Sequence, residues 1–176
     1  QPGKSLLILN TFTMEAANTT LRQRVGYFGA NNGVYFEQNG ATNSLNFVVR
    51  SWANGSLVEE RVSQANWNHD AFDGSGNSER VLDITKTQLF FTDFQWLAVG
   101  RVRCGFVYKG NVVICHTFDH TNVLDVAYMQ NPNLPIRCEI LNTGTTSGGS
   151  MDQICATVIS EGGYSQTGID WSVYTS

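Results

Sequence analysis

The chain has 176 residues and a formal net charge of −4, with 41% hydrophobic but only 15% charged residues. A chain of this length buries about 70% of the surface that its unfolded form exposes, so its core needs neither a disulfide nor a metal. No stretch concentrates positive charge, which disfavours general nucleic-acid binding. No segment approaches the roughly 20 apolar residues that span a bilayer, so we expect no membrane insertion.

We find no linker, internal repeat or low-complexity tract, which favours one domain over residues 1–176. The first residue is Gln1 rather than Met, and no tripartite leader precedes the domain. We therefore expect the chain to be a processed product or part of a longer protein.

Short runs rich in Val, Ile, Phe, Tyr and Thr recur between clusters of Gly, Asn or Ser, while helical periodicity is nearly absent. In chain order, these runs predict strands at Leu6–Asn10, Leu21–Phe28, Gly33–Asn39, Leu45–Ser51, Leu57–Ser63, Thr87–Trp96, Gly100–Tyr108, Asn111–Asp119, Pro135–Asn142 and Met151–Ser160. This pattern predicts an all-β fold, an antiparallel two-sheet sandwich of about ten strands that is jelly-roll-like.

Residues that tolerate a positive φ separate several of these strands, as at Asn39-Gly40, Asn54-Gly55 and Lys109-Gly110. Strands joined by such turns are expected to be antiparallel neighbours. Residues 64–80 are too many and too polar for a turn and predict an ordered surface loop, and residues 121–134 predict a second long excursion.

A two-residue loop at Lys109-Gly110 places Cys104 directly opposite Cys115. Centring a further hairpin on residues 143–150 places Cys138 opposite Cys155, so the four cysteines form two predicted cross-strand pairs. Each pair is either two reduced, buried thiols or a disulfide. A zinc site is disfavoured because no two cysteines have the C-x₂-C spacing.

The same register divides the hairpin into a core face and an opposite face that is too apolar to be freely solvated. On this second face Arg103 opposes His116 and Arg101 opposes Phe118. We expect the face to contact another layer, a loop or another subunit. The predicted interface residues are Arg101, Arg103, Ile114, His116 and Phe118.

Arginine supplies most of the basic residues, and most arginines fall on predicted strands. Arg is favoured over Lys where a charge is paired across a contact between proteins. The equally acceptable alternative is that these arginines pair with strand carboxylates such as Glu37, Glu59 or Glu139.

Tryptophans close to Asn and Asp indicate a candidate sugar platform formed by Trp52, Trp67, Asn68 and Asp70. Trp side chains packed in a core or under a loop are the more common outcome. A fully buried Trp67 would count against the sugar site.

Catalytic and metal-binding patterns are weak. In an extended strand the imidazoles of His116 and His120 lie roughly 13 Å apart, too far to share one metal ion. The oxygen-rich loop at residues 70–79 lacks the spacing of an EF-hand. Because no activated nucleophile, selected carboxylate pair or phosphate-binding loop is present, we expect no enzyme activity, no cofactor and no metal.

Four blocks of the chain are distinctive: Arg22-Gln23-Arg24-Val25-Gly26-Tyr27-Phe28, residues 93–106, residues 128–129 with 133–137, and residues 154–164. Together these blocks resemble virion structural proteins of marine tailed phages and large DNA viruses. The resemblance implies a virion location, a part within a longer particle protein, and partners among copies of itself and other virion proteins. It supplies no catalytic residues.

These observations predict a non-enzymatic virion component that assembles through its sandwich surfaces as a capsid, capsid-decorating or tail/fibre protein. The alternative is a carbohydrate-binding β-sandwich module for host attachment, whose partner is a glycan.

Overall fold

A computed structural model describes residues 5–95, 98–144 and 148–161 of the chain. It contains ten strands and one short 3₁₀ helix, η1 (Gln64–Asn66). The strands are β1 (Leu6–Met14), β2 (Leu21–Phe28), β3 (Gly33–Asn39), β4 (Ser44–Ser51), β5 (Val58–Ser63), β6 (Gln88–Phe94), β7 (Val102–Tyr108), β8 (Asn111–Phe118), β9 (Ile136–Asn142) and β10 (Met151–Ser160). All ten predicted strands are confirmed; the predicted strand end at Trp96 and block residues 162–164 lie outside the described residues.

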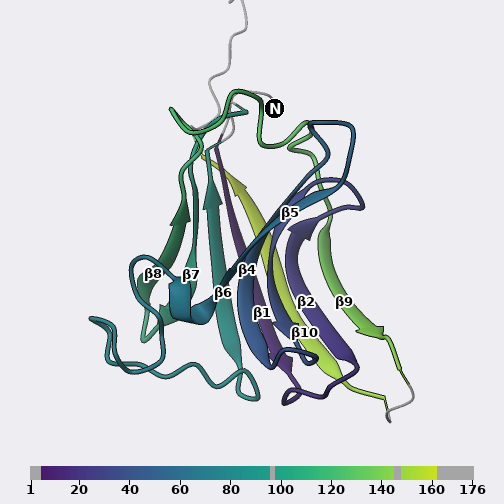
Figure 1. The fold of residues 1–176 in the computed structure, drawn as a ribbon. Helices are drawn as coiled ribbons and strands as arrows, with labels where there is room; N and C mark the ends of the chain where they lie inside the picture. The colour runs from purple at the N-terminus through teal and green to yellow at the C-terminus, as the bar shows by residue number, and fades with distance from the viewer. Residues whose placement is uncertain (1–4, 96–97, 145–147, 162–176) are drawn as a thin grey trace, which may run out of the picture.

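Two antiparallel five-stranded sheets pack face to face (Figure 1). Sheet A has the strand order β10-β1-β6-β7-β8, and sheet B has the order β5-β4-β3-β2-β9. Hairpins connect β2 to β5 within sheet B and β6 to β8 within sheet A, whereas the chain changes sheet between β1 and β2, β5 and β6, β8 and β9, and β9 and β10. The predicted all-β sandwich is therefore confirmed.

Alternating residues from both sheets fill the space between them with aromatic rings. Phe36 of β3 lies at the centre, with ring centroids 5.4–6.0 Å from those of Phe12, Phe47, Phe90 and Phe106. All five rings are at most 1% exposed. Burial of such large apolar side chains is the main stabilising contribution to a sandwich of this kind.

The segment between β5 and β6 closes one end of the core. Most residues of the predicted surface loop at 64–80 are exposed or part-exposed, but the segment also contributes side chains to the core. Trp67, Phe72, Leu82 and Ile84 from this segment belong to the same buried cluster as the strand residues. The Asp70 carboxylate holds the segment in shape by accepting hydrogen bonds from the backbone N–H groups of Phe72 and Ser78, at 2.9 and 2.7 Å.

The β7–β8 hairpin begins in the predicted register, with Tyr108 opposite Asn111 and Phe106 opposite Val113. A β-bulge then inserts one extra residue, so Cys104 pairs with His116 rather than with Cys115. Gly105 lies at this position, and a Cβ there would come within 2.0 Å of the Val113 carbonyl oxygen. The absence of a side chain allows the two backbones to approach closely where the register changes.

The predicted β9–β10 hairpin is wrong, because the two strands lie at the edges of different sheets. Cys138 of β9 pairs with Val25 in sheet B, and Cys155 of β10 pairs with Thr11 in sheet A. All four cysteines have free thiols. Among the described residues, no helix is long and apolar enough to cross a membrane.

Candidate functional site

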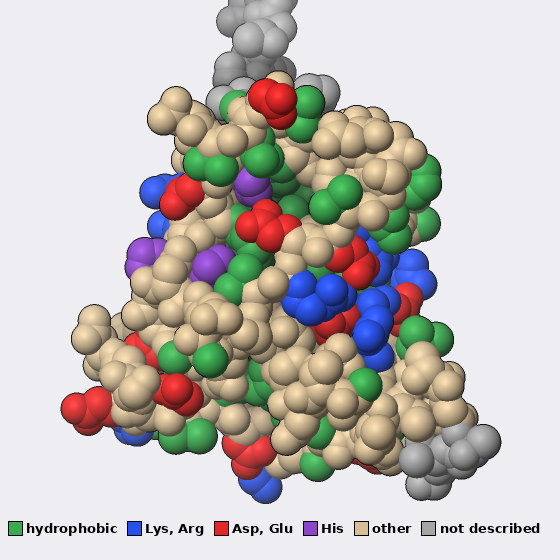
Figure 2. Space-filling view, viewed as in Figure 1, with side chains coloured by type: hydrophobic (Ala, Val, Ile, Leu, Met, Phe, Trp, Pro, Cys, Tyr) green, Lys and Arg blue, Asp and Glu red, His purple; other side chains and the backbone are tan. Residues whose placement is uncertain are grey.

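The outer face of sheet B, directed away from the core, carries an unusual concentration of charge. Basic and acidic side chains lie side by side over this sheet in Figure 2. We call it the arginine face and define it by Arg22, Arg24, Phe28, Tyr35, Glu37, Arg50, Glu59, Arg61, Arg137 and Glu139. These residues come from all five strands, because every second residue of a strand points to the same side of the sheet.

Glu37 of β3 is at the centre of an ion-pair network, and its side chain is 0% exposed. Its carboxylate accepts hydrogen bonds of 2.8 Å from Nε of Arg24 and from Nε of Arg61. Arg22 Nε lies farther away, at 3.8 Å. A buried carboxylate needs such partners, because an unpaired charge is costly to remove from water.

The network continues in both directions from Glu37 across the sheet. Toward the β9 edge, Arg24 donates to Glu139 at 2.6 Å, and Glu139 also accepts from Arg137 at 2.5 Å. Toward the β5 edge, Arg61 donates to Glu59 at 2.9 Å, and Glu59 accepts from Arg50 at 2.7 Å. The prediction that strand arginines pair with Glu37, Glu59 and Glu139 is therefore confirmed.

Aromatic rings lie beneath the guanidinium groups. Phe28 and Tyr35 are 0% exposed, although they are on the outer side of the sheet. Arg50 lies 5.0 Å from the Tyr35 ring centroid and 5.5 Å from that of Phe28, and Arg137 lies 5.3 Å from the Phe28 centroid. The arginines therefore shield the rings from water and are held in position by cation–π contacts.

The contacts on the arginine face shift the pKa values of Glu59 and Tyr35. Burial alone would raise the pKa of Glu59, but hydrogen bonds from Tyr35, Arg61 and Arg50 outweigh it and hold the pKa at about 2. Burial and the hydrogen bond to Glu59 raise the pKa of Tyr35. Glu59 is therefore ionised and the Tyr35 hydroxyl is neutral at physiological pH.

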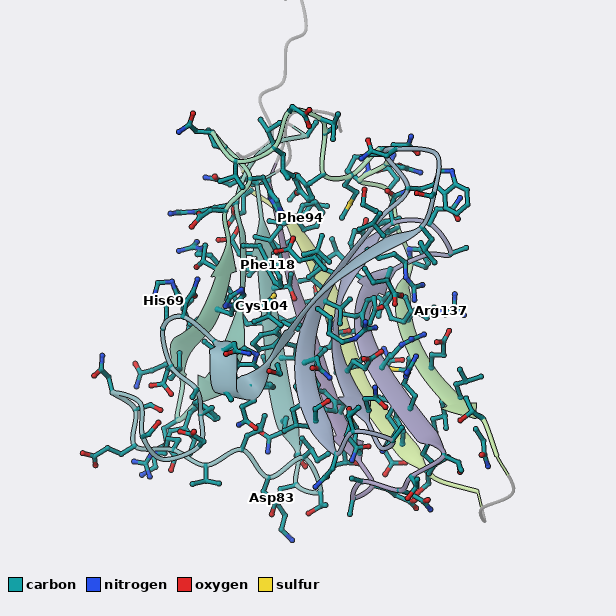
Figure 3. All side chains as sticks on the ribbon, viewed as in Figure 1. His69, Asp83, Phe94, Cys104, Phe118 and Arg137 are labelled. Atoms are coloured by element: carbon teal, nitrogen blue, oxygen red, sulfur yellow. The ribbon has the colours of Figure 1, made fainter. Side chains whose placement is uncertain are left out.

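The network contains five arginines and three glutamates, so positive charge is in excess on a chain of net charge −4. Arg22 and Arg137 are the most exposed arginines of the face. Their side chains are 32% and 42% exposed, and each forms a salt bridge to one glutamate. The Nε atom of Arg22 is buried without a hydrogen-bond partner among the described residues. Figure 3 shows Arg137 at the side of the molecule opposite to His69.

The structure does not bring the predicted sugar residues together. Trp67 is 6% exposed, stacks on Phe47 at 4.1 Å and donates its Nε1–H to the Val62 carbonyl oxygen. Asn68 is exposed but bonds the backbone of Thr117, and Asp70 is buried within its own loop. Trp52 is 36% exposed. The burial of Trp67 counts against the site as predicted.

The predicted interface is formed only in part, because the β-bulge changes which residues point outward. Phe118 pairs with Val102 and is 2% exposed in the core, where Figure 3 also labels Phe94 and Cys104. His116 is 7% exposed, and its Nδ1 accepts a hydrogen bond from the backbone N–H of Asn68. Arg101 is exposed, and Arg103 pairs with Asp93 rather than with His116.

The outer face of sheet A is nevertheless apolar, and more extensive than the hairpin alone. We call it the apolar face: Leu7, Leu9, Leu89, Phe91, Val107, Val112, Ile114 and Ile159, which lie on the outward side of all five strands. Val112 is 51% and Ile159 is 45% exposed. The Asp93–Arg103 ion pair lies among these side chains.

The cysteines show no common site. Burial and the nearby Cys115 raise the pKa of Cys104, and burial raises the pKa of Cys115. Burial also raises the pKa of Cys138, to about 11, whereas Cys155 is exposed. Within the described part of the chain, no group of three or more His, Cys, Asp or Glu residues could hold a metal ion.

Comparisons with known proteins give no family. No protein-family model matches the chain, and no curated protein matches it. The chain is 12% identical to a structure reported as "Cell entry of botulinum neurotoxin type C is dependent upon interaction with two ganglioside molecules", over 89% of this chain and 31% of that chain, with a TM-score of 0.43. It is 12% identical to one reported as "Crystal structure of HCR/D-Sa-GBL1/C", over 78% of this chain and 32% of that chain, with a TM-score of 0.37. The chain spans about a third of the length of each.

Proposed function

We propose that the chain is a non-enzymatic carbohydrate-binding module, and that it binds an oligosaccharide bearing a carboxylate on its arginine face. The observation that supports this proposal is the excess of arginine over glutamate on one sheet face of an acidic protein. A carboxylate beside Arg22 or Arg137 completes the ion pairing that the three glutamates leave incomplete.

The geometry of the face suits such a ligand. A guanidinium group binds a carboxylate through two parallel N–H···O bonds, and this preference depends on its planar shape. Arg24 and Arg50 are fixed by carboxylates and by aromatic rings, so little side-chain entropy is lost when a ligand binds beside them. The sugar hydroxyl groups would find acceptors in Glu59 and Glu139.

The test is a binding measurement on matched acidic and neutral glycans. By calorimetry, we expect a sialylated trisaccharide to bind and its neutral parent disaccharide to bind about ten-fold more weakly or not at all. Arg137→Ala should weaken binding of the acidic glycan by about ten-fold. Arg101→Ala removes the same charge from an exposed position before β7 and should have no effect.

Equal binding of the acidic and neutral glycans would disprove recognition through the carboxylate. Equal losses in Arg137→Ala and Arg101→Ala would show that the net charge matters rather than the arginine face. Absence of binding to any glycan of a broad array would remove the proposal altogether.

The apolar face favours a second candidate, a virion structural component that assembles through sheet A. Contiguous apolar surface on a sheet commonly marks a contact between proteins. This proposal agrees with the resemblance to virion proteins and places the chain in a virus particle. Its contact surface includes Ile114 and Arg103 from the predicted interface but excludes His116 and Phe118.

Light scattering at several protein concentrations tests this candidate. We expect a discrete oligomer or larger assembly that dissociates on dilution. Val112→Lys places a charge at an exposed position of the apolar face, on its edge strand β8, and should yield a monomer. Val81→Lys, at an exposed loop position, should leave the assembly unchanged. A monomer at all concentrations would contradict self-assembly through this face.

A further inference from the structure

A small pocket with a volume of about 130 Å³ lies at the end of the sandwich where residues 52–57 and 121–134 both run (Figure 1). One wall is formed by β4 and β5, through Val49, Val58 and Glu60. The opposite wall is formed by the long loop after β8, through Leu124, Val126 and Tyr128. Because Val58, Leu124 and Val126 are 39–49% exposed, the mouth of the pocket opens to solvent.

His120 lines this pocket and is fixed in orientation, although it is 2% exposed. Its imidazole ring stacks on the Tyr128 ring, with centroids 4.0 Å apart and planes inclined by 6°. Its Nδ1 lies 2.7 Å from the Gly100 carbonyl oxygen. A carbonyl oxygen can only accept, so Nδ1 carries the proton and Nε2 of the neutral ring is left as an acceptor.

That acceptor has no partner: Nε2 is buried without a hydrogen bond to any residue that the structure describes. Leaving a buried polar atom unpaired is costly because the atom loses its hydrogen bonds to water, so buried acceptors in proteins are nearly always satisfied. His120 therefore brings an unsatisfied acceptor to a mainly apolar pocket, and a ligand with one donor that reaches Nε2 would complete it.

We propose that this pocket binds a small neutral molecule with an aromatic ring and one hydroxyl group, such as a phenol, whose O–H donates to Nε2 of His120. The volume of the pocket is close to that of an engineered cavity of about 150 Å³ that binds benzene. The apolar walls contact the ring, and Glu60 at the mouth disfavours an anion. The proposal is independent of the arginine face, which lies on the other side of sheet B.

The test is a titration of the uniformly ¹⁵N-labelled protein, followed by the backbone amide resonances. We expect phenol to shift the resonances of Val58, His120 and Leu124 in a saturable way, with a Kd of about 1 mM. Toluene has the same shape but no donor and should bind about ten-fold more weakly. Benzoate should bind more weakly than phenol because of Glu60.

Two variants separate the hydrogen bond from the pocket. His120→Phe should lower the affinity for phenol to that for toluene. Val126→Trp, at a position 39% exposed, fills the pocket without altering His120 and should abolish the shifts with both ligands. Val112→Trp places the same bulk on sheet A and should change neither titration; it also serves as the folding control.

The proposal is overturned if phenol causes no saturable shifts, if the shifted resonances lie away from the pocket, or if phenol and toluene bind equally to the wild-type protein. Should His120→Phe fail to fold, the toluene comparison and Val126→Trp still decide the outcome. Retained phenol binding in folded Val126→Trp also overturns it.

Discussion

The outer faces of the two sheets are built on the same backbone pattern but differ in chemistry. The arginine face of sheet B buries Phe28 and Tyr35 under a continuous network of ion pairs. The apolar face of sheet A exposes Val112 and Ile159 and includes the Asp93–Arg103 pair. Burial of an aromatic ring therefore does not identify the core of this protein, because guanidinium groups can cover a ring as effectively as a second sheet.

The difference predicts how each face is used. A network of fixed charges with surplus arginines suits a polar, anionic ligand, because its groups stay hydrated until the ligand replaces the water. An apolar sheet face gains free energy only when another apolar surface covers it.

Substitution of Glu37 tests whether the arginine face is a single network. Glu37→Gln removes the buried negative charge that Arg24 and Arg61 share. Only Glu139 and Glu59 then remain as their partners, one for each guanidinium group. We expect the free energy of unfolding to fall by about 3–5 kcal/mol, measured by urea denaturation. Glu139→Gln is the matched control at the partly exposed end of the network and should cost about 1 kcal/mol or less. Similar losses in both variants would contradict a network centred on Glu37.

The stability of the protein at low pH tests the position of His116, which the β-bulge in β8 turns toward the core. Burial and the nearby His69 lower the pKa of His116 from 6.5 to about 4. The unfolded chain therefore binds this proton first, so stability is complete above pH 6.5 and is lost as the pH falls toward 4. We expect a loss of about 2 kcal/mol between pH 7 and pH 5, measured by urea denaturation at each pH.

His116→Gln supplies the control, because its amide oxygen can still accept from the Asn68 N–H but does not titrate. Its stability should depend less steeply on pH over the same range. An unchanged slope would show that His116 is not the group responsible.

Removal of a terminal arginine sharpens the distinction between binding and stability on the arginine face. Because Arg137 is 42% exposed and pairs with one glutamate, Arg137→Ala should lower the free energy of unfolding by about 1 kcal/mol at most. Thermal unfolding with and without the acidic glycan provides the measurement. The glycan should raise the melting temperature of the wild type and raise that of the variant by less. An equal increase in both proteins would show that Arg137 does not contribute to binding the ligand.

Thiol labelling reports on the apolar face without altering its stability. Cys155 pairs with Thr11, whose side chain is on the outward side of sheet A, and it is exposed. Iodoacetamide followed by mass spectrometry should modify Cys155 first, Cys138 more slowly because its pKa is about 11, and Cys104 and Cys115 only after unfolding.

If a second copy covers the apolar face, modification of Cys155 should slow as the protein concentration rises, while that of Cys138 should not. Rates that are independent of concentration for both thiols would indicate a face that stays open to solvent.

The sequence alone predicted the strands well, because alternation and turn residues act locally. The ranges Gly33–Asn39 and Met151–Ser160 are the same in the prediction and in the structure. The first strand is longer than predicted and ends at Met14, since Phe12 and Met14 continue the inward alternation beyond the buried Asn10. One of the two interpretations of the strand arginines also named Glu37, Glu59 and Glu139 as their partners.

Which strands are neighbours, and which side chains share a face, depends on contacts between residues far apart in the sequence. The predicted β9–β10 pairing is wrong because β9 lies at the edge of sheet B and β10 at the edge of sheet A. The bulge at Cys115 reversed the expected positions of His116 and Phe118, since one extra residue turns every following side chain to the opposite face. His120 meets Leu124 and Val58 in one pocket only after the sheets have packed. Strand formation depends on local periodicity, whereas faces and pockets depend on contacts between residues distant in the chain.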